Sequence, residues 1–286
     1  MNLGILTSGN LGKDTLEKIL SEYKVSFVLT DSKSDGVIAL CEEHNIPCFI
    51  GNPRNGKGFA FIKERKVDVI ASINYLFLIE ADIIGHASKL TFNIHGSLLP
   101  KYRGRTPHVW AIINNEKETG ITAHLIDEGC DTGAILHQIV IPITENDTGN
   151  DLLNKYKENY FGLVQNVLNK IELDKLEPQE QDSNLATYFG VRRPTDGHIN
   201  WNWQKERIIN WVRAQASPYP GAFSYLNGNK ITIDKVVPVE QGFHFETENG
   251  TILETEPNLI IKTPNGALKV EQSREEVEVK NGDKLT

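Results

Sequence analysis

LGILTSGNLGKDTLEKIL, residues 3–20, contains in order a short apolar run, a turn with two glycines and an amphipathic stretch. This order is typical of a strand that leads into a helix. It recurs along the chain, with apolar runs at 3–6, 25–30, 47–50, 67–72 and 90–94 and helical stretches at 15–20, 35–44, 58–66 and 79–87. Strands that alternate with helices join by right-handed crossovers into a parallel sheet. The pattern therefore predicts a doubly wound α/β domain with a mostly parallel sheet.

The sequence changes character after residue 120. Two apolar runs flank the polar loop 127–133 and predict a hairpin. Beyond residue 222, short alternating stretches are separated by Asn-Gly pairs, which are the strongest short-range hairpin signal. We therefore expect two domains: residues 1–200, and residues 201–286 with a helix and a small all-β, barrel-like module. The segments behind this expectation are runs 121–126 and 134–142, helices 148–172 and 205–215, and the pairs Asn227-Gly228, Asn249-Gly250, Asn265-Gly266 and Asn281-Gly282.

Composition narrows the classes of function. The 286 residues carry 38 acidic and 30 basic side chains, a net charge of -8, and a protein that binds nucleic acid through many phosphates would normally be basic. The three cysteines (41, 48 and 130) have neither zinc-site nor disulfide spacing, so no metal is expected. The first residues lack a signal-peptide pattern, and no apolar run is long enough for a membrane helix. We expect a soluble cytoplasmic protein that binds small molecules, not a nucleic acid or a membrane.

Polar residues follow three of the predicted strands. They lie at 7–10, 72–75 and 93–97, where each apolar run ends. In open α/β sheets, ligands bind outside the carboxyl ends of the strands. These three segments are therefore expected to line one site.

Asn93 and His95 are the residues there with the clearest chemistry. In an extended segment, residues two apart project to the same side, so both can face one point. An amide can donate to a developing oxyanion, and an imidazole can take or give a proton near neutral pH. Together they suit the attack of an amine on a carbonyl. The alternative is a satisfied loop histidine beside a turn asparagine. Asp131, in a loop flanked by glycines, favours the catalytic interpretation, because a carboxylate can orient an imidazole.

The stretch NIHGSLLPKYRGRTPHVWAIINNEKETGITAHLIDEGCDTGAI, residues 93–135, resembles the signature region of the folate-dependent formyltransferases. FGVRRPTDGHINW (189–201) and WVRAQASPYPGAFSYL (211–226) also have counterparts in that family. The resemblance implies a Rossmann-like catalytic domain followed by an OB-like C-terminal domain. It implies transfer of a formyl group from N10-formyltetrahydrofolate to an amine, with no metal. Asn93, His95 and Asp131 fall on the family's catalytic positions.

The resemblance also implies a folate cleft lined by main-chain groups and apolar side chains. Without the family, the same two segments would be interpreted as ordinary core strand and turn. The residues that the resemblance assigns to the folate are Tyr75, Phe77, Leu78, Ile79, Ile126, Asp127 and Gly129.

Three acceptors occur in related enzymes: initiator methionyl-tRNA, glycinamide ribonucleotide and amino sugars on nucleoside diphosphates. Nine glutamates between residues 222 and 286 oppose a tRNA backbone. KYRGRTPHVW, residues 101–110, resembles the sugar-nucleotide enzymes. We expect a dTDP-linked amino-dideoxyhexose, such as dTDP-4-amino-4,6-dideoxyglucose or its 3-amino isomer, for surface polysaccharide or O-antigen synthesis. The alternatives are a methionyl-tRNA formyltransferase and a non-catalytic folate- or nucleotide-binding regulator.

Two segments are candidates for the sugar nucleotide. The turn Ser8, Gly9 and Asn10 could offer backbone N–H groups, although a strand-to-helix turn needs glycines in any case. Arg103 and Arg105, with Lys101 and Tyr102, could bind the diphosphate, and surface salt bridges are the alternative role of the arginines. The sugar, its ring position, the nucleotide and the oligomeric state stay open, and the acidic β module is a candidate homodimer surface.

Overall fold

The computed structural model describes residues 1–286 and divides into two compact units. The first unit contains residues 1–104, 120–141 and 155–188. The second contains residues 105–119, 142–154 and 189–286. No helix combines the length and apolarity needed to cross a membrane.

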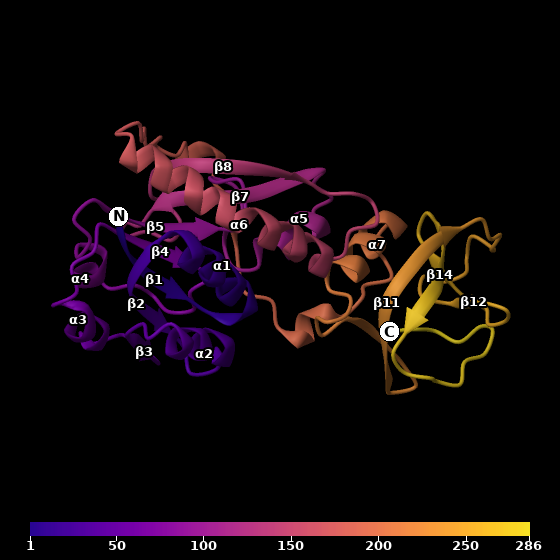
Figure 1. Ribbon diagram of the computed structural model, residues 1–286. Coiled ribbons are helices and arrows are strands. Elements are labelled where there is room, and N and C mark those ends of the chain that lie inside the picture. Colours follow the sequence, from indigo (N-terminus) through magenta and orange to yellow (C-terminus); the bar gives the residue numbers. More distant parts are fainter. The chain divides into compact units, whose positions relative to one another are not determined.

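The first unit is built on a seven-stranded sheet with the order β3-β2-β1-β4-β5-β7-β8 (Figure 1). β1 to β5 pair in parallel, whereas β7 runs antiparallel to β5. The mostly parallel, doubly wound sheet is thus confirmed. The strands are β1 (Asn2–Thr7), β2 (Lys24–Thr30), β3 (Cys48–Ile50), β4 (Val69–Ile73), β5 (Leu90–His95), β7 (Glu118–Leu125) and β8 (Ile135–Pro142).

The helices of this part of the chain alternate with the strands as predicted, but their lengths differ. The helix expected over 79–87 is only four residues long, and Gly85 follows it as the C-cap. The core joins strands to these helices: Leu6, Phe27 and Ile70 pack with Ile62 of α3 and Ile83 of α4. The helices are α1 (Gly9–Glu22), α2 (Asp35–Glu43), α3 (Lys57–Ile62), α4 (Ala81–Ile84) and α6 (Gly149–Glu172).

The second unit contains a five-stranded antiparallel sheet with the order β10-β11-β14-β13-β12. Asn227-Gly228 connects β10 to β11, as the Asn-Gly pair predicts. At the second hairpin Pro264 and Asn265 connect β13 to β14, and Gly266 is already the first residue of β14. The strands are β10 (Ala222–Leu226), β11 (Asn229–Val239), β12 (Ile252–Glu254), β13 (Leu259–Thr263) and β14 (Gly266–Ser273).

Two helices pack together beside this sheet. α7 (Lys205–Ala214) contacts both β11 and α5 (Pro107–Ile113), a helix that the sequence analysis missed. The Arg192 guanidinium lies between them, 5.1 Å from the Trp110 ring centroid and 4.2 Å from that of Trp211. The short elements are β6 (Arg103–Gly104), which pairs with β9 (Tyr188–Phe189), and the 3-10 turns η1 (Ser183–Leu185) and η2 (Pro194–Gly197).

Candidate active site

The register of the sheet sets the position of Asn93. Ser72 of β4 is its partner on one side, and His124 of β7 is its partner on the other. Asn93 is therefore flanked by polar side chains near the carboxyl end of β5. His95, two residues after Asn93, is the last residue of β5 and lies at the same edge of the sheet.

His95 is buried, with 7% of its surface exposed, and both ring nitrogens face oxygen atoms. Nε2 lies 2.8 Å from the Tyr102 carbonyl oxygen, and because that oxygen only accepts, the ring donates there. Nδ1 lies 3.5 Å from Asp131 Oδ2, which is longer than a good hydrogen bond. The Nδ1 side is therefore the more loosely held side of the ring. Catalytic hydrogen bonds are often long before substrate binds.

Asp131 completes the cluster from the loop between β7 and β8. Its φ of 55° is in the left-handed region, which aspartate tolerates better than most residues. Oδ2 accepts a 2.9 Å hydrogen bond from the Gly104 N–H, and Oδ1 lies 3.6 Å from His124 Nε2. Burial alone would raise the pKa of this carboxyl, but His95, the Gly104 N–H and His124 outweigh it and lower the pKa. Asp131 is therefore a carboxylate at neutral pH.

The backbone of this loop is held tightly. The Gln181 side-chain amide donates to the Asp131 carbonyl oxygen at 2.9 Å and to that of Gly133 at 2.7 Å. At Gly133 a Cβ would lie 1.9 Å from the Leu125 carbonyl oxygen, so only glycine fits. The position of the Asp131 carboxylate thus depends on contacts on both sides of it.

His124 is part of the cluster, although the sequence analysis did not select it. Nδ1 lies 2.7 Å from the Leu125 carbonyl oxygen, which only accepts, so Nδ1 carries a proton. Burial lowers the pKa of His124 to about 4, so the ring is neutral at pH 7 and Nε2 carries a lone pair. Nε2 therefore accepts from Asn93 Nδ2 at 3.2 Å. A histidine within the apolar run 121–126 was the signal that could have identified it.

Asn93, His95 and Asp131 are thus brought together as the sequence analysis predicted, and His124 joins them. The contact with His124 uses one hydrogen of the Asn93 amide and leaves the other for a ligand. An amide donor, an imidazole and a carboxylate around one point can stabilise negative charge on an oxygen and move a proton. Their roles in catalysis stay a prediction.

The predicted folate segments follow β4 and β7. Leu76 and Leu78 are exposed, Leu78 at 71%, while the Tyr75 hydroxyl is buried without a hydrogen-bond partner. The Phe77 ring packs edge-on against Tyr75 at 5.6 Å, and Ile79 packs on the core. In the second segment, Ile126 N–H donates to Thr91, and Asp127 Oδ1 accepts from Gly129 N–H and Thr132 Oγ1.

In the turn of Ser8, Gly9 and Asn10, fewer groups are open to a sugar nucleotide than the sequence analysis expected. Ser8 is 1% exposed, and the Gly9 N–H already donates to Ser34 Oγ at 2.8 Å. Asn74 Nδ2 donates to the Ser8 carbonyl oxygen at 3.0 Å. Asn10 is the exposed side chain of the three.

The basic segment 101–105 divides into buried and exposed residues. Arg103 is 2% exposed and donates through Nε and Nη2 to Gln181 Oε1 and through Nη1 to the Tyr188 hydroxyl. Tyr102 is also buried, with a φ of 60°. Lys101 and Arg105 are exposed. The Arg103 guanidinium thus binds other residues of the protein. The exposed cations of this segment are Lys101 and Arg105.

A parallel-sheet domain with polar side chains at its strand ends, joined to an antiparallel β module, defines a two-part α/β architecture. The chain matches the family model of the formyl transferases over residues 14–167 and that of the formyl transferase C-terminal domain over residues 192–280. The chain therefore belongs to the formyl transferase family.

Three relatives illustrate the similarity. The bifunctional polymyxin resistance protein ArnA of Wigglesworthia glossinidia brevipalpis is 38% identical over 229 residues, which are 80% of this chain and 34% of that protein. The chain thus spans about a third of the length of this curated relative.

Two solved structures share the fold. WlaRD, a sugar 3N-formyl transferase crystallised with dTDP and 5-N-formyl-THF, is 22% identical with a TM-score of 0.72, covering 97% of this chain and 99% of that one. An N-formyltransferase from Helicobacter canadensis, in complex with folinic acid and dTDP-3-aminofucose, is 24% identical with a TM-score of 0.72, covering 95% and 99%.

Proposed function

We propose that the protein transfers a formyl group from N10-formyltetrahydrofolate to the amino group of a nucleotide-linked amino sugar. The observation that carries this proposal is the cluster of Asn93, His95 and Asp131 at the end of β5. Membership of the formyl transferase family supports the type of reaction. The ligands of the two structural neighbours support the folate donor and the dTDP-sugar acceptor.

The loop after β4 fits the proposed folate. Exposed Leu76 and Leu78 offer apolar surface for the faces of a pterin ring, and the buried Tyr75 hydroxyl lacks a partner in the protein. N10-formyltetrahydrofolate supplies, when bound, a formyl carbon attached to a nitrogen that can leave. The roles of Phe77, Ile79, Ile126, Asp127 and Gly129 remain part of this proposal.

The three residues Asn93, His95 and Asp131 have different roles in the proposal. The Asn93 amide donates to the formyl oxygen the hydrogen that His124 does not use. His95, or a water beside it, takes the proton that the attacking amine loses. Asp131 orients the His95 ring. The proton taken from the amine passes to N10 as the bond from the formyl carbon to N10 breaks.

For the acceptor, the proposal specifies a dTDP-linked 3-amino- or 4-amino-dideoxyhexose used in surface polysaccharide synthesis. The exposed Lys101 and Arg105 contact the diphosphate in this proposal. Arg103 instead supports the Asp131 loop, because Gln181 binds both its guanidinium and the Asp131 carbonyl oxygen. Asn10 is the residue of the first turn that is open to the sugar nucleotide.

The test is release of tetrahydrofolate with a panel of amines. The purified protein is incubated with N10-formyltetrahydrofolate and, separately, the two dTDP-amino sugars, a UDP-amino sugar and methionyl-tRNA. Fastest release and a formylated product are expected with one of the dTDP-amino sugars. Faster release with methionyl-tRNA than with every sugar would overturn the proposed acceptor. If no amine led to release of tetrahydrofolate, the proposal that the protein is an enzyme would be overturned.

A further inference from the structure

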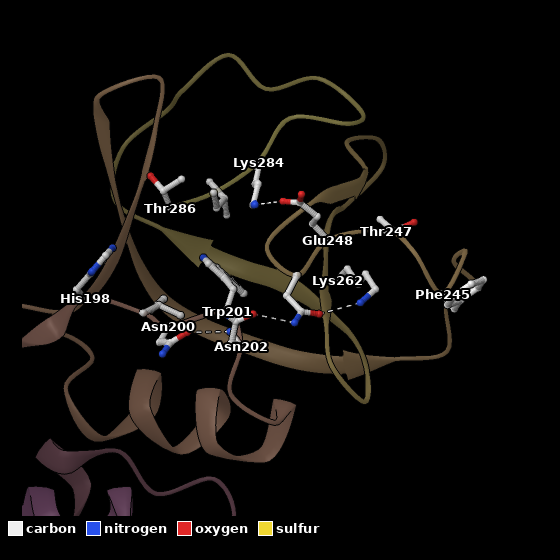
Figure 2. A pocket seen from close by; sticks show the side chains of 13 residues that line it. His198, Asn200, Trp201, Asn202, Phe245, Thr247, Glu248, Lys262, Lys284 and Thr286 are labelled. Atoms are coloured by element: carbon white, nitrogen blue, oxygen red, sulfur yellow. Dashed lines mark hydrogen bonds and ion pairs between the residues drawn. The ribbon is translucent and has the colours of Figure 1, made fainter.

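The second unit contains a cavity that the proposed formyl transfer does not use. Its volume is about 700 Å³. It is lined by the segment before α7, the loop before β12, β13 and the last residues of the chain (Figure 2). Amides, an imidazole, two lysines and two aromatic rings are among the side chains around it, including His198, Asn200, Trp201, Asn202, Phe245 and Asn249.

Lys262 of β13 is the unusual residue of this cavity, because it is only 5% exposed. Its Nζ donates to Asn249 Oδ1 at 2.8 Å and lies 4.8 Å from the Phe243 ring centroid. It forms no ion pair. An ammonium group has three donor hydrogens, and the amide takes one of them.

The second lysine of the cavity provides a direct contrast. Lys284 is about half exposed and forms an ion pair with Glu248. The more exposed lysine thus has a carboxylate partner, while the buried one has none. Removing a charge from water costs free energy unless an opposite charge or several hydrogen bonds compensate for it. The neighbourhood of Lys262 is therefore suited to an incoming anion.

Neighbouring amides fix the direction of the ammonium. Asn249 Nδ2 donates to Asn202 Oδ1 at 2.9 Å, so Asn249 Oδ1 must be the atom that faces Lys262. The Trp201 indole N–H is used by Ser224 Oγ at 2.9 Å. The remaining amide hydrogens of Asn202 and Asn249 and the Lys262 ammonium can donate to a ligand that carries several acceptor oxygens.

We propose that this cavity of the C-terminal module binds a small oxyanion of the phosphate type, with Lys262 as the charged ligand. A free phosphate ion and the phosphate of a metabolite share this chemistry. Lysine binds phosphate as a point charge, which suits one buried ammonium surrounded by amide donors. Its lining residues do not include Asn93, His95 or Asp131, so binding can be measured without formyl transfer.

The test follows the indole N–H signals of the four tryptophans by NMR, because Trp201 lines the cavity. The full-length protein is titrated with inorganic phosphate, with thymidine diphosphate, and with chloride at equal ionic strength. Trp201→Phe assigns the signal. A saturable shift of the Trp201 signal is expected with a phosphate ligand and not with chloride. Stronger binding of inorganic phosphate would assign a free ion, and stronger binding of the diphosphate would assign a phosphorylated metabolite.

Two lysine variants make the test specific. Lys262→Met should weaken the binding at least about ten-fold, because it removes the charge-assisted hydrogen bond. Lys235→Met removes an exposed lysine of β11 that is paired with Glu271 outside the cavity, and it should retain the binding. No saturable shift in the wild-type protein, or equal binding in Lys262→Met, would overturn the proposal.

Discussion

Asn93 depends on its neighbour for its orientation. Its amide nitrogen lies 3.2 Å from His124 Nε2, and that nitrogen can accept because the Leu125 carbonyl oxygen holds the ring proton on Nδ1. Burial keeps the ring neutral by lowering its pKa to about 4. His124 therefore turns the donor end of Asn93, not its oxygen, towards the cluster. We interpret His124 as a positioning residue for the proposed reaction.

Replacement of His124 tests this role. In His124→Phe the Asn93 amide loses its acceptor, and kcat should fall roughly ten- to hundred-fold with little change in KM, because the affected donor acts on the developing oxyanion. His124→Gln supplies an amide oxygen that can accept from Asn93, so it should recover part of the lost rate. A loss confined to KM, or equal losses in both variants, would contradict the positioning role.

The loop between β7 and β8 positions Asp131, and its geometry depends on one glycine. Gly133→Ala would bring a methyl group to 1.9 Å from the Leu125 carbonyl oxygen, so the backbone must move. We expect a loss of roughly 1–3 kcal/mol in the free energy of unfolding. The rate of tetrahydrofolate release should fall at least about ten-fold, because Asp131 moves away from His95.

A second glycine gives the matched control. Gly162 lies exposed in α6, and outside its chain neighbours and the backbone of its own helix no atom lies within 4 Å of a Cβ built there. Gly162→Ala should raise the free energy of unfolding by about 0.5–1 kcal/mol and leave the rate unchanged. Urea unfolding and initial rates measure both effects. Wild-type activity in Gly133→Ala would show that Asp131 does not need this loop geometry.

At the level of elements, the apolar runs predicted the strands well, because buried parallel strands are continuous apolar stretches. α5 was missed: its seven residues, PHVWAII, are too few to show a helical period, although Pro107 at its first turn is a typical start. In the candidate site, Asn93 and His95 could be predicted from their spacing at a strand end. The burial of Arg103 and the role of His124 could not, because both depend on partners distant in sequence.

For the whole molecule, the buried His124 and the partly buried His108 predict sensitivity to acid. Burial lowers the pKa of His108 and of His124 to about 4, from an ordinary value of 6.5. Between those values the unfolded chain binds more protons than the native protein, so the free energy of unfolding falls as the pH falls. Each histidine should contribute roughly 2–3 kcal/mol to that loss between pH 7 and pH 4.

Urea unfolding at pH 7 and pH 4.5 measures this loss. His108→Gln keeps a polar partner for the Tyr219 hydroxyl but cannot gain a proton, so its stability should change less with pH than that of the wild type. The same replacement at the exposed His44 is the control and should leave the pH dependence unchanged. A wild-type protein that is equally stable at both pH values would contradict the expectation.

The two units of the structure are not separated by a single boundary in the sequence. The second unit includes residues 105–119 and 142–154 as well as 189–286, and α5 in the first of these segments packs on α7. The boundary expected after residue 200 stays a prediction. It was placed where the composition changes, and composition cannot reveal that an earlier segment packs with a later one.

The most direct test of the central claim compares two histidines in one assay of tetrahydrofolate release. His95 lies at the end of β5 in the candidate site, whereas His137 on β8 is in contact with Lys170. With the amino sugar that the wild-type protein uses fastest, His95→Ala should lose at least about 100-fold in rate, and His137→Ala should stay within about three-fold. Near-normal release in His95→Ala, or no release by the wild type with any amine, would contradict the account.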